Sequence, residues 1–245
     1  MNTKTSRREF LQRAAVLAGS APLAPGLLGA VRAATEPPSP PIATPPLEGS
    51  QSKGYQCFSP DEAAFVEALV DLMCPADNLT PGGVECGLAV FIDRQLAGAF
   101  GKGERLYRRG PWQQGKPQQG YQLPLTPEVF FKLGLAAADR ACTGKYGKGF
   151  ADLPPAEGND FLNLLGEGKI TDSHLPLADW FNDLLYPLFV QACYADPMYG
   201  GNKDKVFWKM VGYPGLPAVY GLDMVTFRGK PHPGLADPKS IADFS

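Results

Sequence analysis

The sequence predicts a mainly helical, compact domain with long, ordered loops rich in Gly and Pro. Apolar residues recur at three- and four-residue spacing in several segments, and residues typical of helix starts precede the clearest of them. No segment shows the sustained alternation of apolar and polar residues that a half-buried strand would show. The 245 residues include 28 glycines and 25 prolines, which indicates many turns between the helices.

Residues 1–34 are typical of a twin-arginine export signal. The pattern consists of two adjacent arginines, one spacer and an apolar pair, namely Arg7, Arg8, Phe10 and Leu11. The Ala-, Gly- and Leu-rich stretch that follows is broken by prolines and is too weakly apolar for a good membrane anchor. Small residues flanking Arg32 predict cleavage near Ala33. The alternative is an N-terminal amphipathic helix with a chance Arg-Arg pair.

A Pro-rich linker and one domain follow the signal. Residues 35–56 begin Glu-Pro-Pro-Ser-Pro-Pro and carry no core residues, so we expect an extended linker. Residues 57–245 are long enough for one domain with a substantial core.

The first helix of this domain is predicted to start after Ser59. Ser59 can cap the helix, Pro60 suits its first position, and Glu62 completes a capping box. Apolar residues then recur at helical spacing until Pro75 ends the run.

Two further long helices are predicted. One follows the Thr80-Pro81-Gly82-Gly83 turn, has an apolar face from Val84 to Ala99, and stops at Gly101. The other starts at Thr126-Pro127-Glu128 and runs to about Tyr146. Shorter helical patterns cover residues 155–165, 176–194 and 203–210, and we expect Pro187 to kink the second of these.

Composition and cysteine spacing limit the class of protein. The net charge is −2 and no basic stripe is present, so no nucleic-acid partner is expected. Five cysteines in an exported chain favour disulfides, with at least one thiol left free or paired with another chain. Cys74 and Cys86 flank a turn-rich segment and are the first candidate pair. No Cys-x-x-Cys-His is present, so no c-type haem attachment is expected in this chain.

No motif predicts a catalytic, cofactor or metal site within the chain. Gly-x-Ser-x-Gly, Gly-x-Gly-x-x-Gly, phosphate-loop and His-Glu-x-x-His patterns are missing from the sequence. His174 follows Asp172 and Ser173, which would suit a free-standing periplasmic hydrolase, but a helix-capping segment is the better interpretation. The loop at Asp196 lacks the alternating oxygen ligands of a calcium loop.

Two loops combine aromatic residues with Gly and Pro, at residues 107–122 and 196–213. Rigid aromatic side chains of this kind are typical of interface centres. We therefore expect a partner-binding surface, although both loops could instead pack on their own helices. The predicted partner-binding residues are Tyr107, Trp112, Tyr121, Tyr199, Asn202, Trp208 and Tyr213.

The domain resembles the small (gamma) subunit of membrane-bound gluconate 2-dehydrogenase. The resemblance covers about residues 55–245 and includes the C-terminal Ser-Ile-Ala-Asp-Phe sequence. Its most specific part is Tyr-Gly-Gly-Asn at residues 199–202, with Trp-Lys-Met-Val-Gly-Tyr-Pro-Gly at residues 208–215. Cys74 and Cys86 stand where that family would have apolar or small residues.

The resemblance implies an accessory subunit with no active site and no cofactor of its own. It implies three partners: an FAD-containing GMC-type dehydrogenase large subunit, a multihaem cytochrome c subunit and the twin-arginine translocase. The small subunit would bind, stabilise and escort the flavoprotein to the periplasm, at the outer face of the inner membrane. Related complexes oxidise fructose, sorbitol, glucose or 2-ketogluconate, and a sugar-acid-binding protein is a further alternative.

Overall fold

The computed structural model describes residues 54–107, 109–113, 115–116, 119–217 and 219–244. These residues form α-helices, short 3₁₀ helices and one isolated bridge between Gly215 and Lys239, and they contain no strand. The predicted mainly helical class is therefore confirmed. The predicted signal peptide and the linker as far as residue 53 lie outside the described residues.

Helix α2 (Pro60–Met73) begins as the sequence predicts. The Ser59 hydroxyl accepts a hydrogen bond from the Glu62 amide at 3.4 Å, and the Glu62 carboxylate accepts one from the Ser59 amide at 2.8 Å. This reciprocal capping box satisfies two donors that the first helical turn would otherwise leave free. The buried face of α2 carries Phe65, Val66, Leu69 and Val70.

Helix α3 (Leu88–Ala97) starts later than predicted, because residues 83–87 form turns. Gly87 caps the helix with a φ of 78°, in the left-handed region that favours glycine. A β-carbon at Gly87 would lie 2.3 Å from the Gly200 carbonyl oxygen. The close approach of the 200–201 backbone thus sets where α3 can begin, and Val84 and Ala99 are exposed outside its buried face.

Helix α4 (Pro127–Tyr146) agrees with the prediction and is capped by Thr126, whose hydroxyl accepts from the Val129 amide. Gly147, with a φ of 73°, ends it. The short helix η2 (Phe150–Asp152) then leads into α5 (Pro155–Gly166).

The predicted kink near Pro187 takes the form of a π-helical turn. The sequence is α6 (Leu177–Asp179), the π-turn η3 (Trp180–Leu185) and α7 (Tyr186–Tyr194). Proline has no amide hydrogen, and its ring would clash with the carbonyl four residues earlier. A wider turn relieves that clash, and within it the Tyr186 amide bonds to the Phe181 carbonyl five residues back.

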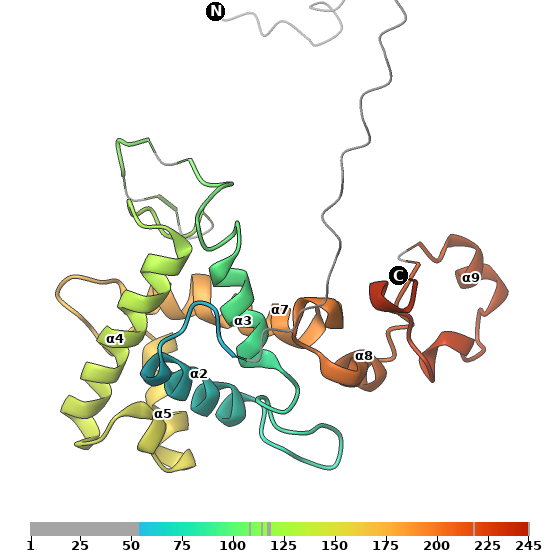
Figure 1. The fold of residues 1–245 in the computed structure, drawn as a ribbon, viewed down its shortest axis with the longest axis horizontal. Helices are drawn as coiled ribbons and strands as arrows, with labels where there is room; N and C mark the ends of the chain where they lie inside the picture. The colour runs from blue at the N-terminus through green and yellow to red at the C-terminus, as the bar shows by residue number, and fades with distance from the viewer. Residues whose placement is uncertain (1–53, 108, 114, 117–118, 218, 245) are drawn as a thin grey trace, which may run out of the picture. The chain divides into compact units, whose positions relative to one another are not determined.

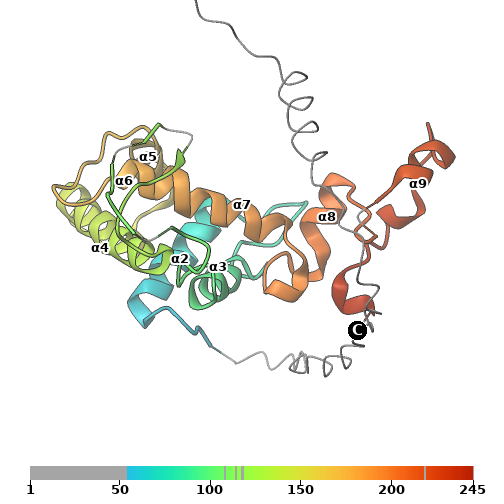
Figure 2. The ribbon, with the colours of Figure 1, turned by 90° about the horizontal axis from the view of Figure 1, so that it is seen from above.

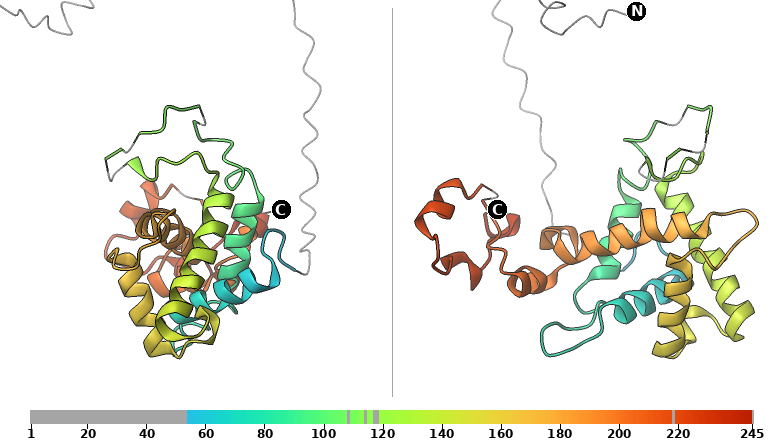
Figure 3. Two further views of the ribbon diagram at one scale, coloured as in Figure 1. Left: turned by 90° about the vertical axis from the view of Figure 1, so that its left-hand side faces the viewer. Right: turned by 180° about the vertical axis from the view of Figure 1, so that it is seen from behind.

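Shorter elements complete the described chain. They are η4 (Pro197–Tyr199), η5 (Lys203–Lys205), α8 (Val206–Val211), α9 (Gly221–Thr226), η6 (Pro233–Leu235) and η7 (Ile241–Phe244). In Figure 1, helices α2, α3, α4 and α5 form one group, and α7 runs from this group to α8. Figures 2 and 3 show the same group from other sides, with α7 alongside α3.

One hydrophobic core joins α2, α3, α4, α5 and α7. Trp180 is among the largest fully buried side chains of this core. The indole nitrogen of Trp180 donates to the Phe131 carbonyl at 3.1 Å. The ring lies against Gly134, where a β-carbon would approach the indole to 2.1 Å. The missing side chain of Gly134 thus gives α4 the notch that receives Trp180. No described helix is long and apolar enough to cross a membrane.

This notch predicts opposite effects for two glycine substitutions in the same helix. Gly134→Ala should lower the free energy of unfolding by about 3 kcal/mol, because Trp180 must move and the core is overpacked. Gly144→Ala, at an exposed site with open space around it, should raise it by about 1 kcal/mol through helix propensity. Urea denaturation of both variants is the measurement, and equal effects would contradict the notch.

Candidate functional site

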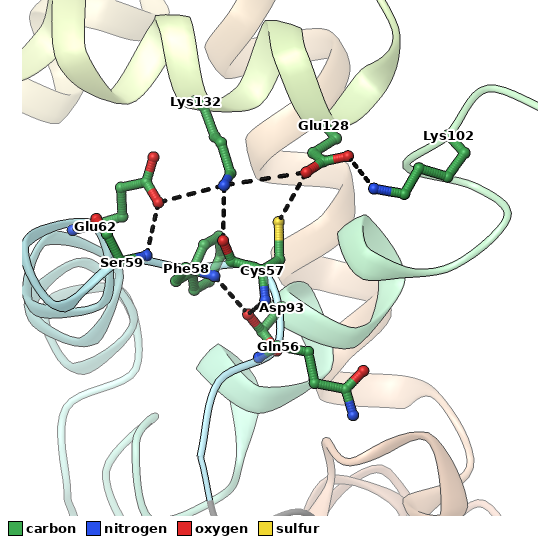
Figure 4. Close-up of polar contacts among 9 residues, drawn as sticks. All are labelled: Gln56, Cys57, Phe58, Ser59, Glu62, Asp93, Lys102, Glu128 and Lys132. Carbon is green, nitrogen blue, oxygen red and sulfur yellow. Dashed lines mark hydrogen bonds and ion pairs between the residues drawn. The ribbon is translucent and has the colours of Figure 1, made fainter.

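Asp93, on α3, is a buried carboxylate that holds the segment where the described chain begins (Figure 4). One carboxylate oxygen accepts from the Gln56 amide at 2.7 Å. The other accepts from the amides of Cys57 and Phe58 at 2.8 and 2.9 Å. Burying a carboxylate is costly unless hydrogen bonds compensate, and three charge-assisted bonds do so here.

This clamp positions the residues that start α2. Phe58 stacks on Phe131 of α4 with ring centroids 5.8 Å apart, and Ser59 is placed at the helix N-cap. Tyr55 is tied to α2 as well, since its hydroxyl donates to Glu67 at 2.6 Å. The start of the domain is therefore fixed to α2, α3 and α4 together.

Lys132 of α4 links this segment to a group of charges, also drawn in Figure 4. Its ammonium donates to the Cys57 carbonyl at 2.7 Å and lies 3.6 Å from Glu62 and 4.0 Å from Glu128. The Lys102 ammonium contacts Glu128 at 2.5 Å, and this hydrogen bond holds the pKa of the Glu128 carboxyl below its usual range.

Cys57 lies beside Glu128 but does not have the chemistry of a nucleophile. Its thiol donates to the Glu128 carboxylate at 3.6 Å. Burial raises the pKa of Cys57 to about 11, despite the opposing charge of Lys132. A catalytic cysteine needs a lowered pKa, so this group of residues is suited to holding the fold rather than to catalysis.

His174, Asp172 and Ser173 form a turn and not a catalytic triad. Asp172 accepts hydrogen bonds from the backbone amides of His174 and Leu175 at 2.9 and 3.0 Å. The first of these bonds is the main reason that the pKa of Asp172 is lowered. His174 is exposed, and Asp172 contacts Arg140 at 3.6 Å. Among the described residues, no group of His, Cys, Asp and Glu could hold a metal ion.

The first aromatic loop presents two of its predicted residues on the surface. Tyr107 is 79% exposed and Trp112 is 38% exposed. Tyr121 instead turns inward, and its ring lies 4.4 Å from that of Phe130. Burial raises the pKa of Tyr121 to about 12, and its buried hydroxyl has no hydrogen-bond partner among the described residues.

Asn202 and Trp208, which were predicted to bind a partner, are buried in the structure, 0% and 5% exposed. The Asn202 side chain donates to the Ala195 carbonyl at 3.1 Å and accepts from the Phe207 amide at 3.0 Å. The Trp208 indole donates to the Tyr194 carbonyl at 2.8 Å. Both side chains satisfy backbone groups of their own loop, so their role is to shape it.

Tyr199 and Tyr213 flank these buried residues. Tyr199 is 45% exposed at the end of η4, so it remains available to a partner. Tyr213 is half-buried, with its ring edge-on to Trp208 at 5.0 Å. Nothing in the structure tests whether either residue contacts a partner, and these assignments stay predictions.

Tyr199 also lines an open groove between α3 and α7, which we call the α3–α7 groove. Its volume is about 960 Å³. Helix α3 supplies one wall, α7 the other, and the turn after α3 closes one end. The side chains that give the groove its mainly apolar lining include Phe91, Phe100, Leu106, Val190, Tyr194 and Tyr199.

Most of these groove residues were not identified from the sequence. Val190 and Tyr194 are four residues apart in a helical pattern, which looks the same whether the face is buried or exposed. Phe100 lies just beyond the end of α3, where periodicity gives no orientation. A prediction of the groove would have required the packing of α3 against α7.

The export-signal residues Arg7, Arg8, Phe10 and Leu11 lie outside the described residues. Cys74 and Cys86 are free thiols in the structure, so their disulfide stays a prediction.

The sequence model of one protein family, described as gluconate 2-dehydrogenase subunit 3, matches residues 60–215. The matched region contains α2 to α8 and every groove residue named above. No curated protein and no solved structure matched the chain.

The clamp at Asp93 predicts a large effect of a conservative substitution. Asp93→Asn should lower the free energy of unfolding by about 2–4 kcal/mol, because an amide offers one acceptor oxygen to three backbone donors. Glu85→Gln, at an exposed position, should change it by less than about 0.5 kcal/mol. Chemical denaturation compares the two, and an Asp93→Asn variant as stable as Glu85→Gln would show that the clamp is unimportant.

Proposed function

Because the chain belongs to the gluconate 2-dehydrogenase subunit 3 family, we propose that it is a non-catalytic small subunit of a membrane-associated, FAD-dependent gluconate 2-dehydrogenase-type complex. In this proposal the chain binds and stabilises the flavoprotein subunit and escorts it through twin-arginine export to the periplasm. The flavoprotein oxidises D-gluconate to 2-keto-D-gluconate, and electrons pass to a cytochrome c subunit and to quinone. FAD and haem c are thus held by the partner subunits.

The observation that carries the proposal is the α3–α7 groove. Its walls leave Phe100, Leu106, Val190, Tyr194 and Tyr199 exposed side by side within the region that the family shares. Contiguous exposed apolar surface is unfavourable in water unless another molecule covers it, and it commonly marks a protein interface. Tyrosine and phenylalanine in such a surface supply large contact area with little loss of side-chain entropy.

The lining of the groove favours a protein partner over a sugar acid. Gluconate carries a carboxylate and several hydroxyl groups, so a site for it needs several hydrogen-bonding side chains directed at one place. The polar residues that line the groove are Gln95, Glu104, Arg105 and Gln191. The opposite charges of Glu104 and Arg105 provide no net attraction for an anion. A mainly apolar lining with a few polar side chains is instead the usual composition of a protein interface.

The groove predicts a difference between two exposed tyrosines of α7. Tyr194→Ala should weaken binding of the flavoprotein subunit of a gluconate 2-dehydrogenase about thirty-fold, since loss of an aromatic anchor costs about 2 kcal/mol. Tyr186→Ala is the matched control, because Tyr186 is 49% and Tyr194 47% exposed but only Tyr194 lines the groove. Affinity is measured with the two subunits co-expressed, purified and then titrated.

Two outcomes of that titration have different meanings. If the unaltered chain retains no flavoprotein, the proposed function is wrong. If it retains flavoprotein but Tyr194→Ala and Phe100→Ala bind as tightly as Tyr186→Ala, the partner binds another surface. Thermal unfolding of each variant separates lost binding from lost folding.

The escort role predicts that both subunits depend on one signal. Replacement of Arg7 and Arg8 by Lys should leave the flavoprotein in the cytoplasm, because the proposal gives it no signal of its own. Dehydrogenase activity in periplasmic and cytoplasmic fractions is the measurement, with Lys4→Arg as a signal variant that keeps the arginine pair. Undiminished periplasmic flavoprotein in the Lys-Lys variant would contradict the escort role.

A further inference from the structure

Two of the five cysteines, Cys74 and Cys86, lie on either side of the turn between α2 and α3, and Cys193 lies on α7. Cys74 follows the end of α2, Cys86 lies in the turn before α3, and Cys193 is near the end of α7. The thiols of Cys74 and Cys86 face the same acceptor, the Pro81 carbonyl oxygen, with sulfur–oxygen distances of 4.0 and 3.4 Å. Because both sulfur atoms contact one oxygen, they lie on the same side of the turn between the two residues.

The backbone already holds the two cysteine segments together. The Cys74 carbonyl accepts from the Gly83 amide at 2.9 Å, and the Cys86 amide donates to the Gly82 carbonyl at 2.9 Å. Asp77 closes the far end of the loop by accepting from the amides of Leu79 and Thr80. The loop is thus folded back on itself, which keeps the two cysteine segments next to each other.

The pKa of Cys193 responds to Cys74 and Cys86, and those of the remaining two cysteines respond to other groups. Burial is the main cause that raises the pKa of Cys193 to about 12, and the nearby thiols of Cys74 and Cys86 raise it further. The pKa of Cys57 responds instead to Lys132 and Glu128, and that of Cys142 to Asp139 and Glu157. Cys74 and Cys86 are thus the two thiols that share a contact, at the Pro81 carbonyl oxygen.

Access distinguishes the thiols of Cys74, Cys86 and Cys193. Cys74 is half-buried, whereas Cys86 and Cys193 are 1% and 6% exposed. An external oxidant can therefore approach Cys74 but cannot reach the other two without local opening. Cys86 shares its acceptor oxygen with Cys74 and flanks the same turn, while Cys193 belongs to a separate helix.

We propose that Cys74 and Cys86 are a disulfide-forming pair, with Cys74 as the accessible thiol, Cys86 as the resolving thiol and Cys193 remaining reduced. The oxidant is an external disulfide. Burial raises the pKa of the Cys74 thiol, so the reaction proceeds through the small fraction that is thiolate at pH 8. That thiolate attacks one of the oxidant's sulfur atoms, which breaks the oxidant's disulfide bond, forms a mixed disulfide and releases one thiol. Cys86 then loses its proton and attacks the Cys74 sulfur, and the second thiol leaves. The protein loses two electrons and two protons, and the oxidant becomes two thiols.

The bond would join the end of α2 to the turn that precedes α3. It closes a loop that includes Pro81, Gly82 and Gly83, and this turn leads to Gly87, whose position against Gly200 sets the start of α3. Constraining a loop of this length in the unfolded chain should raise the melting temperature by about 5 to 10 °C. The inference does not depend on the proposed function.

The test uses the purified full chain, first reduced and then incubated with oxidised glutathione at pH 8. Mass spectrometry of a non-reduced digest should show a Cys74–Cys86 link, and thiol titration should fall from five groups to three. Cys74→Ser and Cys86→Ala should each abolish the link and the rise in melting temperature. Cys193→Ala should keep both, and Cys142→Ala serves as a buried-cysteine control.

Two results would overturn the proposal. One is a folded chain that keeps all five thiols under these conditions. The other is a predominant link that includes Cys193 in place of Cys74 or Cys86. Circular dichroism of each variant establishes that it is folded, so a variant that misfolds is not mistaken for one that cannot form the bond. If Cys86→Ala misfolds, the Cys74→Ser and Cys193→Ala variants still decide between the pairs.

Discussion

The packing of α2, α3 and α4 depends on one buried carboxylate, that of Asp93. Its oxygens accept hydrogen bonds from the backbone amides of three consecutive residues, Gln56 to Phe58. These residues lie close to the beginning of the described chain. Those bonds direct the Phe58 side chain onto α4 and place Ser59 at the start of α2. The Lys132 ammonium reaches the same segment from α4 through the Cys57 carbonyl. A hydrocarbon in place of the carboxylate would remove the acceptor of three backbone amides, of which that of Phe58 is in the core.

A second buried polar residue, Asn202, shapes the loop that packs against the start of α3. Asn202 adopts a left-handed backbone conformation with a φ of 48°, and its side-chain amide bonds to Ala195 and Phe207. Next to it, a β-carbon on Gly201 would lie 2.4 Å from the Ala192 carbonyl oxygen. The Gly-Gly-Asn sequence therefore lets the chain after α7 pass against the start of α3. The close approaches of Gly200 to Gly87 and of Gly201 to Ala192 fix the N-terminal end of α3 relative to α7, and the α3–α7 groove follows from that packing.

The parts of the fold that were predicted from the sequence are those determined by local chemistry. Ser59 with Glu62, and Thr126 with Pro127, start helices through bonds made within one turn, so residue type alone identifies them. The start of α3 could not be predicted in this way, because the distant Gly200 carbonyl decides it. The same limit applies to Trp208, since an aromatic residue in a Gly-rich loop suits an interface or a core equally well. Only its bond to the Tyr194 carbonyl shows that it faces inward.

Burial and hydrogen bonding shift the pKa values of several described groups away from neutral pH. Burial raises the pKa values of Cys57, Cys86, Cys142 and Cys193 to between about 11 and 12, so these thiols stay protonated near neutral pH. Hydrogen bonds and cations lower the pKa values of Glu128 and Asp172, which keeps both ionised. General acid–base catalysis needs the opposite arrangement, with pKa values moved toward the working pH. The exposed apolar groove is the feature of the described residues that suits the binding of a partner. In the proposed complex, the flavoprotein supplies the reacting groups, and this chain supplies the α3–α7 groove, whose helix α3 holds the start of the domain through Asp93 and packs at its own start against the Asn202 loop.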